Sequence, residues 1–81
     1  TEKENSFKIY PNPGTNQLQI QLNEISGNEE LFIRSIDGRI ILQQKNVSPS
    51  VSVNTTTWNA GMYFVELRNA KKRNVIKWIK E

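Results

Sequence analysis

Residues 7–22 read FKIYPNPGTNQLQIQL, and this stretch decides the fold class. Phe7 and Ile9 flank a lysine, and over residues 17–22 three apolar side chains alternate with three glutamines. A period of two puts the apolar side chains on one face of a β-strand and the polar ones on the other. The stretch therefore predicts two half-buried strands, joined by a short connection that is rich in proline.

The connection between these two strands contains two prolines and a glycine. Pro11 has no backbone N–H and cannot continue the ladder of the first strand. The residue before a proline is pushed into extended geometry, and here that residue is Asn12. Pro13 and Gly14 suit the two central positions of a type II turn over residues 12–15. We therefore predict that the connection turns the chain and carries no chemistry of its own.

Five further strands follow at short intervals. The dipeptide Asp37-Gly38 predicts a two-residue type I′ turn, because both central positions of that turn favour a positive φ. The segment 62–68 is apolar on both faces, at least at its start, and is expected at a central, doubly covered position. The five strands are expected at residues 30–36, 40–44, 51–53, 62–68 and 75–80. Seven short strands with turns between them predict an all-β fold, a seven-stranded immunoglobulin-like antiparallel β-sandwich.

The composition fits one small domain with a large surface. The chain has 81 residues, of which 36% are hydrophobic and 23% charged, which suits a thin two-layer core. Its net charge of +3 is too small to indicate a nucleic-acid partner. Residues 1–6 are polar and are expected to be a linker remnant, without the apolar h-region of a signal peptide. We expect the domain at residues 7–81 to be a piece of a longer protein.

The residue types that most catalytic sites need are missing. The sequence has no histidine and no cysteine, which removes the common nucleophile–base pairs and thiolate zinc sites. Neither a calcium-binding loop nor a glycine-rich phosphate loop is present. Glu66 lies in the middle of an expected strand beside basic residues, which favours a cross-strand salt bridge. We therefore expect no enzyme, no metal site and no cofactor.

The aromatic residues allow two interpretations. A domain of this size needs most of them for its core. Aromatic side chains that are exposed could instead stack on sugar rings, as in carbohydrate-binding modules. Trp58 lies in a polar stretch and Trp78 lies in the lysine-containing terminal strand. Exposure of either ring would favour the carbohydrate-binding interpretation.

Basic residues gather near the end of the chain, and their role is open from sequence alone. They could keep an edge hairpin from aggregating, because charges on an edge strand oppose pairing with other chains. They could equally form an electropositive docking edge for a partner. The residues concerned are Arg68, Lys71, Lys72, Arg73, Lys77 and Lys80.

Three stretches occur in an order that resembles a known family: residues 7–22, FIRSIDGRII at 32–41, and NAGMYFVELRNAKKRNVIKWIKE at 59–81. Together they are similar to the type A C-terminal sorting domain of the bacterial type IX (Por) secretion system. Ser35 stands where the family often has aspartate, and Trp58 stands where it usually has leucine. The residues that match the family motifs are Tyr10, Pro11, Asn12, Pro13, Gly38, Arg39, Gly61, Tyr63, Val65, Lys77 and Lys80.

The resemblance implies a function and a set of partners. Domains of this family are non-catalytic signals at the C-terminus of exported cargo, and they share the sandwich predicted above. The implied partners are an N-terminal cargo domain, the outer-membrane translocon and a surface sortase, with no role for nucleic acid. The implied route leads through the periplasm to the cell surface or the medium.

The terminal strand offers a physical route to recognition. Its backbone edge and basic side chains could bind a receptor by strand addition, and the edge could also pair with a second copy of the chain. Two other functions fit the residues: a carbohydrate-binding module of a secreted enzyme, and an inert immunoglobulin-like accessory spacer. Removal of an inert spacer would leave secretion unchanged, whereas removal of a sorting signal would abolish it.

Overall fold

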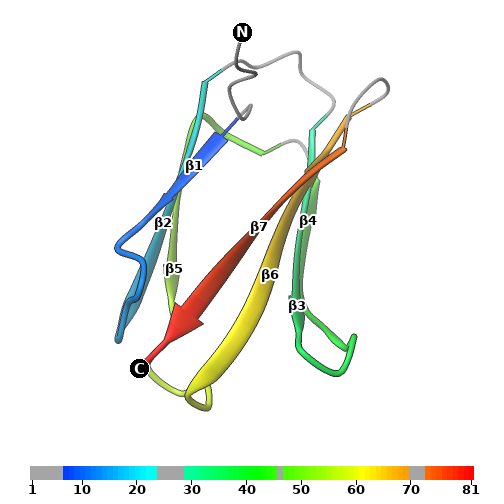
Figure 1. Cartoon of the computed structure of the whole chain (residues 1–81). Coiled ribbons are helices and arrows are strands. Elements are labelled where there is room, and N and C mark those ends of the chain that lie inside the picture. The colour runs from blue at the N-terminus through cyan, green and yellow to red at the C-terminus, as the bar shows by residue number, and fades with distance from the viewer. Residues whose placement is uncertain (1–6, 24–28, 46, 70–72) are drawn as a thin grey trace, which may run out of the picture.

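The computed structural model describes residues 7–23, 29–45, 47–69 and 73–81. These parts of the chain form seven strands in two antiparallel sheets that face each other (Figure 1). The predicted all-β sandwich of seven strands is thereby confirmed. The predicted linker at residues 1–6 lies outside the described residues, as do Lys71 and Lys72. Within the described parts, the structure contains no helix with the length and apolar character that a membrane crossing requires.

The first sheet has three strands in the order β1-β2-β5: β1 (Phe7–Tyr10), β2 (Gln17–Leu22) and β5 (Ser50–Asn54). β2 is the middle strand, and its Ile20 pairs with Ile9 of β1 and with Val51 of β5. The apolar residues of β2 are buried while its glutamines lie on the outer face. The period-two pattern of the sequence is therefore the inside–outside alternation of this strand.

The second sheet has four strands in the order β4-β3-β6-β7: β3 (Glu30–Ser35), β4 (Ile40–Lys45), β6 (Gly61–Arg68) and β7 (Arg73–Lys80). β6 lies centrally, as predicted, and its Val65 pairs with Ile33 of β3 and Ile76 of β7. β6 was expected to be covered by other elements on both faces, and this part of the prediction is wrong. Only its inner face packs against the other sheet, and on its outer face arginines of the same sheet cover Glu66.

The core lies between the two sheets and takes residues from all strands except β4, whose Leu42 packs against it. The largest fully buried side chain is that of Trp78, and Phe7 follows it. Thr55 is also fully buried, and its hydroxyl donates to the carbonyl oxygen of Thr15 at 3.1 Å. The hydrophobic core cluster comprises these buried residues: Phe7, Leu18, Ile20, Leu22, Leu31, Ile33, Val47, Val51, Val53, Tyr63, Val65, Leu67 and Trp78.

The hairpin between β3 and β4 has a longer loop than predicted. The N–H of Gly38 donates to the carbonyl of Ser35 at 3.0 Å, and the N–H of Ser35 donates to the carbonyl of Arg39 at 2.9 Å. Ile36 and Asp37 are therefore the central residues, and Gly38 follows them with φ 91°. This is a three-residue loop in which glycine takes the left-handed position. The hairpin is confirmed, but the two-residue type I′ turn is wrong.

Three connections lie at the same end of the sandwich as the C-terminus (Figure 1). They are the connection from β1 to β2, the turn from β3 to β4, and the loop from β5 to β6. β1 begins at the opposite end. This arrangement gathers segments that are far apart in the sequence. They contain five of the eleven residues that match the family motifs: Pro11, Asn12, Pro13, Gly38 and Arg39.

Candidate recognition site

The connection between β1 and β2 binds to the edge of β7. We call its residues 11–14 the clip segment. The side-chain amide of Asn12 donates to the carbonyl of Lys77 at 3.0 Å, and its oxygen accepts from the N–H of Ile79 at 3.2 Å. The side chain thus occupies the place of a peptide group in a β-ladder. The prediction that this connection only turns the chain is incomplete, because it also extends the second sheet.

Gly14 continues this ladder with its backbone. Its N–H donates to the carbonyl of Ile79 at 2.9 Å, and its carbonyl accepts from the N–H of Glu81 at 2.8 Å, which makes a parallel bridge with Lys80. The predicted type II turn is wrong, because Gly14 lacks the positive φ that its second central position requires. Both peptide bonds that precede Pro11 and Pro13 are cis.

Gly14 is buried against the ring of Trp78. A Cβ atom at this position would lie 2.8 Å from Cζ2 of Trp78 and 3.0 Å from the carbonyl oxygen of Pro11. The indole Nε1–H of Trp78 donates to the same Pro11 carbonyl at 2.7 Å. Glycine is therefore required here for close approach, because a side chain would have to displace either the indole or the clip segment.

Two lysines that match the family motif point in different directions. Lys77 is exposed, whereas Lys80 is buried and its amine donates to the carbonyl oxygen of Thr15. On β7 the even-numbered positions face the core, so Lys80 shares a side with Trp78. Lys80 therefore joins the terminal strand to the β1–β2 connection, and Lys77 remains available to a partner.

Three aromatic rings connect the clip segment to the β5–β6 loop. The ring of Tyr63 contacts both Trp58 and Trp78, with centroids 5.0 Å and 6.0 Å away. Trp58 also meets Trp78 edge to face, with centroids 6.2 Å apart. The hydroxyl of Tyr63 donates to the carbonyl of Asn59 at 2.6 Å, which fixes the loop to the start of β6. Tilted and edge-to-face pairs of this kind stabilise a core beyond the apolar area that they bury.

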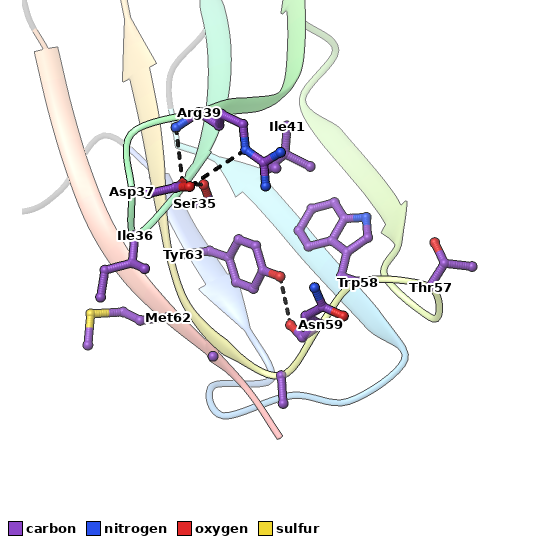
Figure 2. A pocket seen from close by; sticks show the side chains of 12 residues that line it. Ser35, Ile36, Asp37, Arg39, Ile41, Thr57, Trp58, Asn59, Met62 and Tyr63 are labelled. Carbon is purple, nitrogen blue, oxygen red and sulfur yellow. Dashed lines mark hydrogen bonds and ion pairs between the residues drawn. The ribbon is translucent and has the colours of Figure 1, made fainter.

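A hollow of about 410 Å³ opens beside these rings. One wall comes from the β3–β4 hairpin, with Ser35 and Asp37 among its residues, and the other comes from residues 57–63 (Figure 2). The rings of Trp58 and Tyr63 face this space, and the backbone of Gly61 lines it. The hollow therefore combines an aromatic wall with a charged rim.

Asp37 organises the charged rim of the hollow. It accepts hydrogen bonds from the Ser35 hydroxyl and from the N–H of Arg39, the latter at 3.5 Å. The Nε of Arg39 lies 3.7 Å from the second carboxylate oxygen. The Ser35 hydroxyl, with help from Arg39, holds the pKa of Asp37 below its ordinary value. Ser35, which stands where the family often has aspartate, thus donates a hydrogen bond to the acid two positions later, Asp37.

Two motif glycines are required for their backbone conformation. Gly38 has φ 91° and Gly61 has φ 148°, and a Cβ atom at either position would meet nothing within 4 Å. Side chains other than that of glycine are strained at such φ values. These glycines therefore differ from Gly14, where a side chain is excluded by contact with neighbouring atoms.

The remaining motif residues differ in their exposure to solvent. Tyr10 is 45% exposed and lies on the outer face of the first sheet. Val65 is fully buried in the core, so a partner of the folded domain cannot touch its side chain. Exposed motif residues are Tyr10, Pro11, Asn12, Pro13, Gly38, Arg39, Gly61 and Lys77. Local sequence patterns missed the parts played by Gly14, Trp78 and Lys80 in holding the clip segment.

The site offers surfaces for binding and little for chemistry. Among the described residues, no three acidic side chains come close enough to hold a metal ion. Trp78 is fully buried, so it cannot offer a face to a sugar ring. Trp58 is half-buried against Tyr63. The arrangement can therefore bind a partner through the hollow and through exposed charges.

Comparisons with known proteins agree with this geometry. The chain is similar over 93% of its length to a part of PorZ, an essential bacterial surface component of the type IX secretion system of Porphyromonas gingivalis, with 21% identity and a TM-score of 0.78. That part is 11% of the PorZ chain. The chain also resembles a DUF3244 family protein from Bacteroides vulgatus with an immunoglobulin-like β-sandwich fold, with 11% identity and a TM-score of 0.79.

The second likeness covers 94% of this chain and 85% of the other protein. Both identities are low, so these likenesses show the fold, and the immunoglobulin-like sandwich is confirmed. No curated protein matches the sequence. The family model of the secretion system C-terminal sorting domain matches residues 8–81. The chain therefore belongs to the family of secretion system C-terminal sorting domains.

Proposed function

We propose that this domain is a non-catalytic export signal, which directs a cargo attached at its N-terminal side through the type IX secretion system across the outer membrane. The match of the family model to residues 8–81 carries this proposal. The cargo crosses the periplasm and reaches the cell surface or the medium. The translocon recognises the folded domain, and a surface sortase separates it from the cargo in or before residues 1–6.

The arrangement of the motif segments supports this proposal. They lie at the end of the sandwich that is opposite the start of β1 (Figure 1). A cargo joined ahead of β1 would therefore leave the hollow and the clip segment open to a receptor. Immunoglobulin-like sandwiches commonly place their binding loops at one end in this way.

Strand addition at β7 is restricted by the clip segment. Asn12 and Gly14 already bond to the outer edge of β7 from Lys77 onward and to Glu81, which follows this strand. A receptor strand would have to pair with the earlier part of β7, or displace the clip segment. We therefore place recognition on side chains of the folded domain rather than on the terminal half of this edge.

A reporter fusion tests the proposed function. The 81-residue chain is joined to the C-terminus of a periplasm-directed fluorescent protein in a bacterium with an active type IX system. Fluorescence is expected at the surface or in the medium, and a matched strain without a working translocon should retain it in the periplasm. Retention in both strains would contradict the proposal and favour an inert spacer. Mass spectrometry of the released reporter should locate the cut in or before residues 1–6, and a cut within the sandwich would contradict that placement.

Two variants separate recognition from folding. Deletion of residues 75–80 should abolish export, but it also removes Trp78 from the core. Arg39→Glu changes an exposed residue on the rim of the hollow and leaves the core intact. Its export should fall while its thermal unfolding stays close to that of the original chain. Normal export of the Arg39→Glu fusion would exclude this rim from recognition.

A further inference from the structure

The two outer faces of the sandwich differ in chemistry. On the three-stranded sheet, the side-chain amides of Gln17 and Gln19 both donate to the Ser52 hydroxyl at 3.0 Å. This face is mostly neutral, and its polar groups bond to one another. On the four-stranded sheet, cations and apolar side chains share the outer face. One sheet thus resembles an ordinary solvated surface, and the other does not.

The strand register shows which side chains share the outer face of the four-stranded sheet. Successive rows across β4, β3, β6 and β7 contain Ile40, Arg34, Phe64 and Lys77; then Gln43, Phe32, Glu66 and Val75; then Lys45, Glu30, Arg68 and Arg73. We call these residues, together with Ile79, the basic face. It contains five cations and two carboxylates, so its local charge is strongly positive.

One buried carboxylate arranges three of these cations. Glu66 is almost fully buried and is paired with Arg34, with Arg73 at 3.2 Å and with Arg68 at 3.5 Å. This confirms the predicted cross-strand salt bridge. One negative charge cannot neutralise three guanidinium groups, so the cluster keeps a positive charge that faces outward.

The same arginines cover an aromatic ring. Phe32 is buried but is not part of the core cluster. The guanidinium carbons of Arg34 and Arg68 lie 5.1 Å and 4.7 Å from the centre of its ring. Stacking on the ring and pairing with Glu66 hold these planar groups in place. A guanidinium held in one orientation presents its donors in a fork that matches a carboxylate.

Apolar side chains are exposed between the cations. Val75 is 47% exposed and Ile79 is 38% exposed, and on β7 they alternate with Arg73 and Lys77. Ile40 on β4 is 50% exposed. A surface that mixes exposed apolar residues with arginine has the composition of a protein interface.

We propose that the basic face is the docking surface for an acidic partner protein, whose carboxylates surround apolar side chains. The positive charge of the face complements such a surface, and a second copy of this chain would be repelled by it. The oriented arginine forks favour protein carboxylates over a fluid layer of anionic lipid. The inference rests on the proposed function, since the partner is the component of the export machinery that reads the signal.

A pair of charge reversals on the two outer faces tests this proposal in the reporter fusion. Lys77→Glu lies on the basic face, and Lys8→Glu makes the same charge change on the three-stranded sheet. Export is expected to fall about tenfold for Lys77→Glu and to change little for Lys8→Glu. Lys45→Glu provides a second variant on the basic face, should thermal unfolding show that Lys77→Glu destabilises the domain.

The outcomes distinguish the two proposals. If the original fusion is not exported at all, the proposed function is wrong. If it is exported and the basic-face variants match Lys8→Glu, only the docking surface is wrong.

Crosslinking in the exporting strain then identifies the partner class. A photoreactive amino acid replaces Val75 on the basic face or, as the matched control, Ser52 on the other sheet. The expected product is a protein adduct from position 75, attached within an acidic segment and absent from position 52. A lipid adduct, no adduct, or equal adducts from both positions would overturn the proposal.

Discussion

The clip segment and the hollow lie at the same end of the sandwich and contain motif residues of two different kinds. In the clip segment, the carboxamide of Asn12 and the backbone of Gly14 are bonded to β7. On the hairpin that forms one wall of the hollow, Gly38 and Arg39 are exposed to solvent. The comparison shows that one family motif can maintain the fold while another remains available for binding.

The two tryptophans give the largest expected difference between these regions. Trp78→Ala should destabilise the chain by about 3–5 kcal/mol, because it removes a fully buried ring. A loss of this size is a large fraction of the stability of a small domain. Trp58→Ala should cost less than half as much, since Trp58 is only half-buried. Chemical denaturation of both variants checks the order, and equal losses would show that the hollow is as structural as the clip segment.

Gly14 gives the next largest effect. Gly14→Ala should cost about 1–3 kcal/mol, because its Cβ would meet Trp78 at 2.8 Å. Trp78→Phe removes the part of the ring that causes this contact. The double variant should therefore lose less stability than the sum of the two single variants. Gly38→Ala, which is strained by φ and meets no neighbour within 4 Å, serves as the control and should combine additively with Trp78→Phe.

The fold could be predicted from the sequence because apolar and polar residues alternate within its strands. In β2 the apolar and polar residues separate cleanly, so both the strand and its buried face follow from the sequence. In β7 apolar residues occur at odd and even positions, so local alternation could not decide which side faces the core. The structure buries Trp78 and Lys80 and leaves Val75 and Ile79 on the outer face.

The contacts of the clip segment with β7 could not be predicted from the sequence, because they join residues that are far apart in the chain. Asn12 and Lys77 are 65 positions apart, and turn preferences describe only four neighbouring residues. The predicted length of the β3–β4 loop was wrong for a simpler reason. Asp-Gly occurs in both two-residue and three-residue loops, and only the register of β3 and β4 distinguishes them. The hollow could not be predicted either, because its walls come from two separate segments, the β3–β4 hairpin and the β5–β6 loop, whose relative position the sequence does not give.

Asn12→Ala tests the clip segment without disturbing the core. It removes the bonds to Lys77 and Ile79 and should cost about 1–2 kcal/mol. The amide hydrogen of Ile79 should then exchange faster with solvent, as measured by NMR. Asn16→Ala is the matched control, because Asn16 uses its backbone carbonyl to bind Thr55. Unchanged exchange at Ile79 in Asn12→Ala would show that Gly14 alone holds the clip segment.

The smallest expected effect lies at the rim of the hollow. The Ser35 hydroxyl, followed by Arg39, lowers the pKa of Asp37, so the ionised carboxylate is favoured in the folded hairpin. Any stability from this bond is present above the unfolded pKa, near pH 4, and is lost as pH falls through the lower folded value. An NMR titration of the Asp37 carboxyl should therefore have a higher midpoint in Ser35→Ala than in the original chain. Ser52→Ala, on the other sheet, should leave the midpoint unchanged. Equal midpoints in all three chains would mean that the hairpin does not hold this carboxylate, and that the rim of the hollow is not organised before a partner binds.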